Sequence, residues 1–273
     1  MIAPGRARRP GAARGHIDPP TAQELETCPF CEGREEQTPP ETLTLPEREP
    51  PDSPGWRVRV VPNLYPAFER QEVVIHTPRH ARSFADLDAG EVELVADAWQ
   101  LRAQAARHED FAYVHALINE GRDAGASLPH SHSQLVWLRE PPPAVTDERA
   151  ARVPELLARG ELRVAEEDGV AVLSHPAGRG PYEFVVAPLD GEDDAFSSKR
   201  LGTALRVLAG AVARLRNVEG GVPWNAWLHT GSHWHLEVLP RLAVFAGIEL
   251  GAGIYVNTLA PEEAAERLRN AAP

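Results

Sequence analysis

Hydrophobic and polar positions alternate along the chain with two different periods, and each period predicts one kind of element. Two segments with helical spacing predict helices, at about residues 90–107 and 199–216. Shorter apolar runs bounded by turn residues predict strands at 56–62, 72–77, 113–118, 130–138, 170–174, 182–187, 224–229 and 233–239. Proline-rich and glutamate-rich residues 32–55 and the three prolines at 141–143 predict exposed connections.

The order of these predicted elements occurs twice, and short sequence matches accompany the repetition. The segment E-V-V-I-H-T-P-R-H ends at His80 and resembles E-F-V-V-A-P-L-D, which ends at Asp190. Likewise H-S-H-S-Q at residues 130–134 resembles H-W-H-L-E at 233–237. We therefore predict an internal duplication of roughly a hundred residues, a longer period than solenoid repeats have.

This pattern favours the α+β fold class, in which a helix covers one face of antiparallel strands in each unit. The expected units are residues 1–140 and 141–273, and the 42% of hydrophobic residues suffice for a core. No apolar run is long enough to span a membrane and no secretory signal is visible, so we expect a cytoplasmic protein without a membrane partner. The net charge of −12 argues against a nucleic-acid partner.

The segment L-P-H-S-H-S-Q-L-V-W carries the clearest candidate chemistry. Alternate residues of a strand face the same way, so His130, His132 and Gln134 would share one face. The preceding N-E-G-R-D-A-G-A-S-L contains small residues that let backbone N–H groups approach a phosphate. Neutral imidazole is nucleophilic at pH 7, and Gln134 can donate amide hydrogens to a phosphate oxygen. The alternative is an exposed polar strand face on which histidines occur by chance.

The two cysteines of the chain, Cys28 and Cys31, form a C-P-F-C knuckle. A structural zinc ion takes four ligands, so two more must come from elsewhere, and histidine is the natural source. His80 and His130 are the first candidates, and spacing alone leaves four others open: His16, His76, His108 and His115. A redox-active cysteine pair is the alternative, but no thioredoxin-like βαβ pattern surrounds it.

Together these motifs resemble the galactose-1-phosphate uridylyltransferase family of the histidine-triad superfamily. Besides C-P-F-C, the matching segments are R-A-R-R-P at 6–10, V-P-N-L-Y-P-A at 61–67, H-T-P-R-H at 76–80, N-E-G-R-D-A-G-A-S-L-P-H-S-H-S-Q at 119–134, H-W-H at 233–235, F-A-G-I-E-L at 245–250 and P-E-E-A-A-E-R-L-R at 261–269. Ser133 stands where the family has glycine, and the H-S-H-S-Q form is more similar to relatives that use ADP-sugars. The resemblance implies duplicated histidine-triad-like units.

The resemblance also implies roles for individual residues. His132 would be the catalytic nucleophile, and Gln134 and Ser127 would hold the phosphates. The other expected substrate-binding residues are Arg6, Arg9, Asn119 and Glu249. Structural zinc would be bound by Cys28, Cys31, His80 and His130. A second metal site, iron or zinc, has counterparts in Glu148, His229, His233 and His235. The second unit would be a non-catalytic scaffold, because Glu237 there would repel a phosphate.

The activity implied by the resemblance is transfer of a nucleoside monophosphate between sugar 1-phosphates through a covalent nucleotidyl–His132 intermediate. The expected partners are therefore a nucleotide-sugar and a sugar 1-phosphate, and the resemblance implies a homodimer. One alternative is a phosphorylase or hydrolase that uses the same histidine, with phosphate or water as the acceptor. The other is a nucleotide-binding module without catalysis, against which the intact H-x-H-x-Q element argues.

Overall fold

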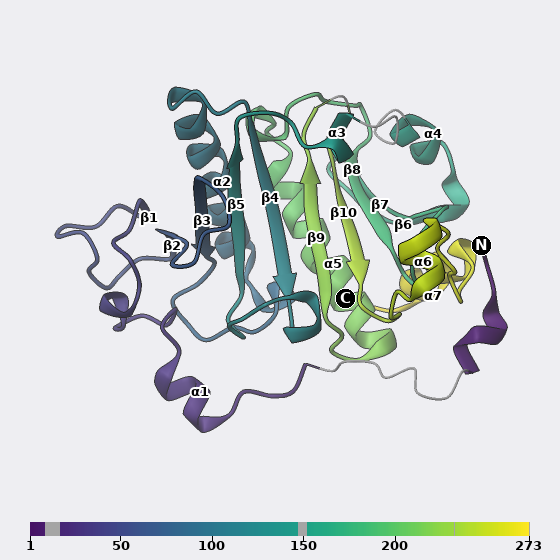
Figure 1. Cartoon of the computed structure of the whole chain (residues 1–273), viewed down its shortest axis with the longest axis horizontal. Helices are drawn as coiled ribbons and strands as arrows, with labels where there is room; N and C mark the ends of the chain where they lie inside the picture. Colours follow the sequence, from purple (N-terminus) through teal and green to yellow (C-terminus); the bar gives the residue numbers. More distant parts are fainter. Residues whose placement is uncertain (9–16, 147–151, 232, 273) are drawn as a thin grey trace.

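The computed structural model describes residues 1–8, 17–146, 152–231 and 233–272, which form one ten-stranded antiparallel sheet flanked by helices (Figure 1). Across the sheet the strands follow the order β1-β2-β3-β5-β4-β9-β10-β8-β7-β6. Their bounds are β1 Leu43–Leu45, β2 Val58–Pro62, β3 Arg70–Ile75, β4 Tyr113–Glu120, β5 His132–Leu138, β6 Arg163–Glu167, β7 Val170–Ser174, β8 Phe184–Pro188, β9 Trp224–His229 and β10 His235–Pro240.

The strand order is symmetric about the central pair β4 and β9, which joins the two halves of the chain. Outward from this pair, β5, β3, β2 and β1 follow on one side, and β10, β8, β7 and β6 follow in the same order on the other. The α+β class and the duplication are therefore confirmed. The division into units 1–140 and 141–273 stays a prediction, since the two halves share one continuous sheet.

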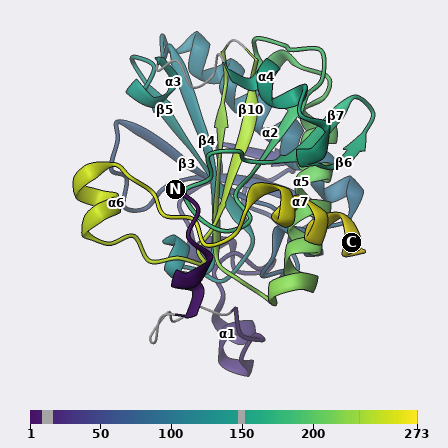
Figure 2. The same ribbon diagram turned by 90° about the vertical axis from the view of Figure 1, so that its right-hand side faces the viewer.

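The two long helices cover one face of the sheet and pack against each other. The helices have the bounds α1 Ala22–Thr27, α2 Ala89–His108, α3 Pro143–Thr146, α4 Val153–Leu157, α5 Leu201–Glu219, α6 Gly247–Ala252 and α7 Pro261–Asn270. Turning the molecule by 90° shows α6 on the opposite side of the sheet from α5 (Figure 2). Among the described residues, no helix combines the length and apolar character that crossing a membrane requires.

Local sequence signals explain where the long helices begin and end. Asp88 caps α2, because its carboxylate accepts the N–H of Glu91 at 2.7 Å while Glu91 accepts the N–H of Asp88 at 2.9 Å. Helix α5 stops at Gly220, whose φ of 81° suits glycine. Both helices lie within three residues of the ranges that the sequence predicts.

Residues of β5 alternate between the helix-covered face and the opposite, open face. Ser133, Leu135 and Trp137 point toward the helices, and both apolar side chains belong to the main hydrophobic core. His132 and Gln134 therefore lie on the open face. In register with them, the same face carries His115, Leu117, Asn119, Asn225, Trp227, His229, His235 and Glu237 from the three neighbouring strands.

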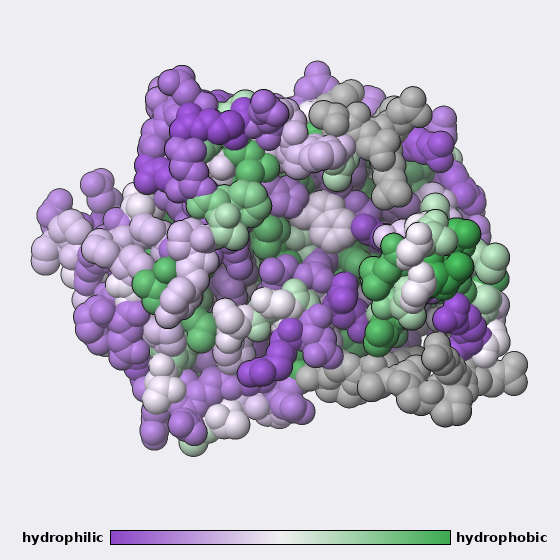
Figure 3. All heavy atoms as spheres, viewed as in Figure 1, coloured by the Kyte–Doolittle hydropathy of each residue, from purple (hydrophilic) through white to green (hydrophobic). Residues whose placement is uncertain are grey.

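Two small hydrophobic clusters cover the outer parts of the open face. One contains Phe30 and Trp56 over β2 and β3, and the other contains Val153 and Leu156 of α4 over β7 and β8. The centre between them is lined mainly by hydrophilic residues, as the surface in Figure 3 shows. The helices therefore cover the face opposite His132, and a polar ligand could approach the central strands only from the open face.

Candidate functional site

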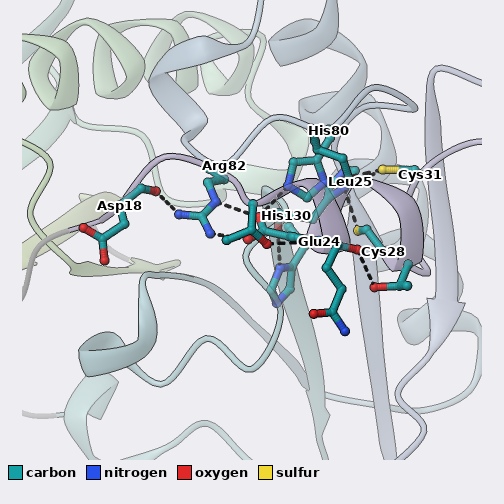
Figure 4. Close-up of polar contacts among 12 residues, drawn as sticks. Asp18, Glu24, Leu25, Cys28, Cys31, His80, Arg82 and His130 are labelled. Carbon is teal, nitrogen blue, oxygen red and sulfur yellow. Dashed lines mark hydrogen bonds and ion pairs between the residues drawn. The ribbon is translucent and has the colours of Figure 1, made fainter.

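The structure brings Cys28, Cys31, His80 and His130 into one cluster beside the start of β5, and their potential ligand atoms all lie within 4.8 Å of one another (Figure 4). The sulfur of Cys28 is 3.4 Å from Nδ1 of His130, and the sulfur of Cys31 is 3.4 Å from Nδ1 of His80. The cysteines precede the sheet in sequence, whereas the histidines flank β3 and β5. A bound metal would therefore join the N-terminal segment to the sheet.

The second ring nitrogen of each histidine in this cluster has its own acceptor. Nε2 of His80 lies 2.7 Å from a carboxylate oxygen of Glu24, and Nε2 of His130 lies 3.0 Å from the carbonyl oxygen of Thr77. Arg82 in turn binds the same Glu24 carboxylate. Each Nε2–H therefore donates, and each Nδ1 directs its lone pair toward the cysteine sulfurs.

The dimensions of the cluster fit a tetrahedral zinc site. Bond lengths of about 2.3 Å to sulfur and 2.0–2.1 Å to nitrogen put tetrahedral S and N ligands about 3.6 Å apart. The observed separations between sulfur and Nδ1 are 3.4 to 3.7 Å. Burial, and then the neighbouring Cys28, raises the pKa of the Cys31 thiol to about 12, so a cation is needed to hold this sulfur as a thiolate. Burial also lowers the pKa of His130 to about 4 and keeps this imidazole neutral.

The other histidines that the spacing left open lie elsewhere or outside the described residues. His76 binds two serines beneath β5, His115 lies within β4, and His108 ends α2 at the surface. His16 falls outside the described residues. The arrangement therefore favours His80 and His130 as the partners of the cysteine pair.

The candidate nucleophile His132 is held by the backbone of His130, one of the candidate metal ligands. Its Nδ1 lies 2.7 Å from the carbonyl oxygen of His130. Because a carbonyl only accepts, Nδ1 carries the proton and the lone pair is on Nε2. The side chain is buried, with 6% exposure, and Phe30 packs edge-on against the ring at 5.5 Å between centroids. Burial lowers the pKa of His132, which favours the neutral, nucleophilic form.

The predicted phosphate-binding groups surround the same end of the sheet. Gln134 accepts a hydrogen bond of 2.6 Å from Gln71 on β3 through its amide oxygen, so its amide nitrogen is the group that can donate to a phosphate. Asn119 on β4 accepts from Asn225 on β9 at 2.7 Å. Ser127 is exposed on the loop that leads into β5.

Glycines give the loop between β4 and β5 its shape. Gly121 and Gly125 have φ values of 85° and 91°, and a Cβ at Gly121 would lie 2.9 Å from Pro223. A side chain at Gly121 would therefore be strained by its backbone and would contact Pro223 too closely. The loop that approaches the candidate phosphate site consequently has a backbone that other residues would not adopt readily.

The remaining predicted substrate-binding residues lie toward the second half of the sheet. Arg6 is 3.8 Å from the buried carboxylate of Glu249. Glu249 also accepts the N–H of Ala246 at the start of α6. In Figure 1 the N-terminus and α6 lie at the right, whereas β5 lies left of the centre. Arg9 falls outside the described residues.

The second unit repeats the geometry of the histidine pair but not its chemistry. Nδ1 of His235 lies 3.0 Å from the carbonyl oxygen of His233, as His132 lies against His130. Glu237 occupies the place of Gln134 and binds Arg179 and His229. Burial raises the pKa of Glu237, but its hydrogen bond from His229 and the charge of Arg179 outweigh burial and hold the pKa well below its usual range.

The predicted second metal site does not assemble as expected in the part of the chain that is described. His229 and His235 stack with 4.7 Å between ring centroids. The ring nitrogens of His229, His233 and His235 do not all lie within 4.8 Å of one another, so the three form no potential ligand group. Glu148, the fourth counterpart, lies outside the described residues. The potential ligand atoms of a different group, His175, Glu183 and Glu237, do lie within 4.8 Å of one another. Arg179, however, forms ion pairs with the carboxylates of both Glu183 and Glu237.

Several residues that support the site were not predicted in these roles from the sequence. They are Glu24, which binds His80; Gln71, which binds Gln134; and His76, Trp99, Ser131 and Ser133, which bond to one another beneath β5. The alternation of Ser131 and Ser133 with the histidines was visible, but their common partner lies 55 residues away in sequence.

Glu120 gives the end of β4 a pH-dependent stability. Burial, opposed by the N–H of Phe84 at 2.8 Å, raises the pKa of Glu120 to about 7. The pKa of Glu120 is higher in the folded than in the unfolded protein, so the protonated carboxyl favours folding. This contribution to the free energy of unfolding is complete below the unfolded pKa and is lost as the pH rises through the folded pKa of about 7.

We therefore expect Glu120→Gln to gain stability relative to the wild type between pH 5 and pH 8, by about 2–3 kcal/mol. Urea unfolding at both pH values measures this difference. Glu266→Gln, an exposed position on α7, is the control and should follow the wild type. Parallel pH profiles for the wild type and Glu120→Gln would contradict the assignment.

Comparisons with known proteins agree with this fold. Residues 66–142 match the family model "Galactose-1-phosphate uridyl transferase, N-terminal domain". ADP-glucose phosphorylase of Arabidopsis thaliana is 28% identical over 98% of this chain and 89% of its own length. Galactose-1-phosphate uridylyltransferase of Thermotoga maritima is 26% identical over 72% of this chain and 73% of its own length.

Solved structures give the same result. The crystal structure of the Arabidopsis thaliana ADP-glucose phosphorylase with bound ADP-glucose superposes with a TM-score of 0.84, at 26% identity, over 100% of this chain and 95% of that chain. A galactose-1-phosphate uridylyltransferase-like protein from Arabidopsis thaliana gives 0.80 at 27% identity, over 90% of this chain and 93% of that chain.

The fold and the H-x-H-x-Q strand thus define a duplicated histidine-triad-like protein. More specifically, the chain is similar in sequence to members of the galactose-1-phosphate uridylyltransferase family, the resemblance that its motifs predict. The two curated relatives are named as a phosphorylase and a uridylyltransferase, so the chain is similar to enzymes that act on nucleotide-sugars or sugar phosphates.

Proposed function

We propose that this protein transfers a nucleoside monophosphate from a nucleotide-sugar through a covalent bond to Nε2 of His132. The observation that carries the proposal is the 2.7 Å contact between Nδ1 of His132 and the carbonyl oxygen of His130. That contact leaves the Nε2 lone pair as the nucleophile, on the strand face that also carries Gln134.

In the first step, Nε2 attacks the α-phosphorus of the nucleotide-sugar. The N–P bond forms as the bond from phosphorus to the bridging oxygen breaks, and the sugar 1-phosphate leaves with that electron pair. The ring becomes cationic in the adduct, and the carbonyl of His130 stabilises it by accepting the Nδ1–H. The amide nitrogen of Gln134 donates to a non-bridging phosphate oxygen. In the second step, an acceptor oxygen attacks phosphorus and regenerates neutral His132.

We propose ADP-glucose as the preferred donor of the nucleotidyl group and inorganic phosphate as the preferred acceptor. The H-S-H-S-Q form and the similarity to ADP-glucose phosphorylase over 98% of the chain support this choice. Phosphate would then take the adenylyl group from His132 to give ADP. Transfer of a uridylyl group to a hexose 1-phosphate is the second candidate, supported by the match of residues 66–142 and the Thermotoga maritima relative.

We further propose that the Cys28, Cys31, His80 and His130 cluster holds a structural zinc ion. The mixed sulfur and nitrogen donors suit zinc, and the separations between them match a tetrahedral site. When bound, the ion supplies a cross-link rather than an open coordination position. Because His130 is both a ligand and the residue whose carbonyl holds His132, this cross-link fixes the nucleophile.

The second unit, proposed as residues 141–273, serves as a scaffold in this scheme. It has no cysteine, and Asp190 at the position of His80 pairs with Arg200 at 2.5 Å. Glu237 at the position of Gln134 is occupied by Arg179 and His229. A carboxylate held in this way does not offer a donor to a phosphate.

Product analysis with two donors and three acceptors tests the substrate choice. UDP-glucose and ADP-glucose are each incubated with the protein in buffer alone, with phosphate, and with galactose 1-phosphate. We expect ADP, and more than one glucose 1-phosphate per active site, from ADP-glucose only when phosphate is present. In buffer alone, release should stop at about one glucose 1-phosphate per site, because the adenylyl group then stays on His132. Release of AMP in buffer alone would identify a hydrolase, and transfer from UDP-glucose to galactose 1-phosphate alone would support the second candidate instead.

A further inference from the structure

A buried histidine lies beneath the strand that carries the nucleophile. His76 follows the end of β3, is fully buried, and bonds to Ser131 through Nδ1 and to Ser133 through Nε2, both at 2.9 Å. Trp99 of α2 donates its indole N–H to Ser133 at 2.9 Å. One imidazole therefore connects the two residues that flank His132 in sequence, on the face of the sheet opposite His132.

These side chains form a hydrogen-bond chain without an orphaned group. The indole N–H of Trp99 only donates, so the Ser133 oxygen accepts it. Burial, together with the proximity of His132 and His130, lowers the pKa of His76 well below its usual value, so one ring nitrogen of His76 donates and the other accepts. A satisfied buried network of this kind holds its members in one geometry.

The network reaches the nucleophile through a single peptide unit. The N–H of Ser131 donates to the carbonyl oxygen of Ala81 at 2.6 Å, and the N–H of His76 donates to the Ser131 carbonyl oxygen at 3.3 Å. The N–H of Ser131 and the carbonyl of His130 belong to the same planar trans peptide and point in opposite directions. Bonds that fix Ser131 therefore fix the direction of the His130 carbonyl.

We propose that His76 is a positioning residue that, through Ser131, aims the His130 carbonyl at Nδ1 of His132 and so keeps Nε2 free to attack. This inference rests on the proposed function. It explains why serines occupy both positions next to the nucleophile, where a simple core strand would carry apolar side chains. A histidine that only filled the core would affect stability but not the tautomer or the reactivity of His132.

The test combines single-turnover kinetics with a double-mutant cycle. His76→Leu, Ser131→Ala and the double variant are mixed with excess ADP-glucose, and the rate of adduct formation on His132 is measured. We expect a loss of roughly tenfold to a hundredfold in that rate for His76→Leu, with the dissociation constant of ADP-glucose within about twofold of wild type. The double variant should form the adduct no more slowly than His76→Leu, because both substitutions remove the same hydrogen bond between His76 and Ser131.

Nitrogen-15 NMR of the His132 ring provides a readout that a purely structural role would not move. In the wild type Nδ1 should be protonated and protected from exchange, whereas both single variants should show a mixture of ring tautomers. Ser174→Ala, a buried serine on β7, is the control and should leave the rate and the spectrum unchanged. Metal content and melting temperature show whether each variant is folded. If His76→Leu does not fold, the rate and the ring tautomer of Ser131→Ala alone decide the test.

A wild-type rate in His76→Leu, or losses that multiply in the double variant, would overturn the positioning role. Failure of the proposed function is distinguishable, because the wild type would then form no adduct at all. In that case the tautomer of His132 in the variants still decides whether His76 positions the ring.

Discussion

Replacement of His132 by glycine is expected to abolish nucleotidyl transfer, with kcat lower by about 10⁴-fold or more. The reason is that Nε2 of this ring is the atom proposed to bond to phosphorus, and glycine supplies no substitute. Steady-state release of glucose 1-phosphate from ADP-glucose measures the effect.

Two comparisons make this result specific to the nucleophile. His108→Ala changes an exposed histidine at the end of α2 and should keep wild-type turnover. The His132→Gly protein should retain its metal, because the Cys28, Cys31, His80 and His130 cluster does not include His132. If His132→Gly keeps normal turnover in a folded protein, the covalent mechanism is wrong.

Replacing Cys28 is expected to lower the free energy of unfolding more than any of the other proposed substitutions. Cys28→Ser should reduce the zinc content from about one ion per chain to near zero and lower the free energy of unfolding by about 3–5 kcal/mol. The cause is the loss of the link that joins the segment before the sheet to His80 and His130. Elemental analysis and urea unfolding measure the two effects.

A chelator provides an independent version of the same experiment. Removing the metal from the wild type should reproduce the instability of Cys28→Ser, and adding zinc should reverse it only in the wild type. Glu26→Gln, an exposed change on the nearby helix α1, is the control. Full stability of the metal-free wild type would contradict a structural role for the cluster.

Much of the fold was predictable because it follows from local patterns. The long helices carry helical spacing and a capping signal at Asp88, and their ends agree with the prediction to within three residues. The strand at Val170–Ser174 was predicted with its observed bounds. The duplication was readable from H-S-H-S-Q and H-W-H-L-E, which lie at corresponding positions in the symmetric sheet.

The candidate site was predictable where a residue type itself indicates the chemistry. A cysteine pair suggests a metal, and alternate histidines on a strand suggest a shared face, so the cluster members and His132 could be named. Side chains that act through distant partners could not be found in this way. Glu24 resembles any exposed helix glutamate until it meets His80, 56 residues later in sequence.

In the described part of the chain, the histidines of the predicted second metal site do not form a ligand group. His229, His233 and His235 are the right residue types at suggestive spacing, but spacing does not determine side-chain direction. His229 instead pairs with Glu237 at 3.1 Å, and Nδ1 of His235 faces the carbonyl of His233. The same carbonyl contact in the first unit holds His132, so the duplication preserved a backbone feature while the surrounding chemistry diverged.

In the proposed mechanism, a single imidazole carries the nucleotidyl group. Mass spectrometry of the intact protein, after brief mixing with labelled ADP-glucose and UDP-glucose in the absence of acceptor, tests it most directly. We predict a mass increase of one nucleoside monophosphate, located on His132 by peptide mapping and removed when phosphate or a sugar 1-phosphate is added. Turnover of either donor with no label on His132 at any time would contradict the covalent mechanism.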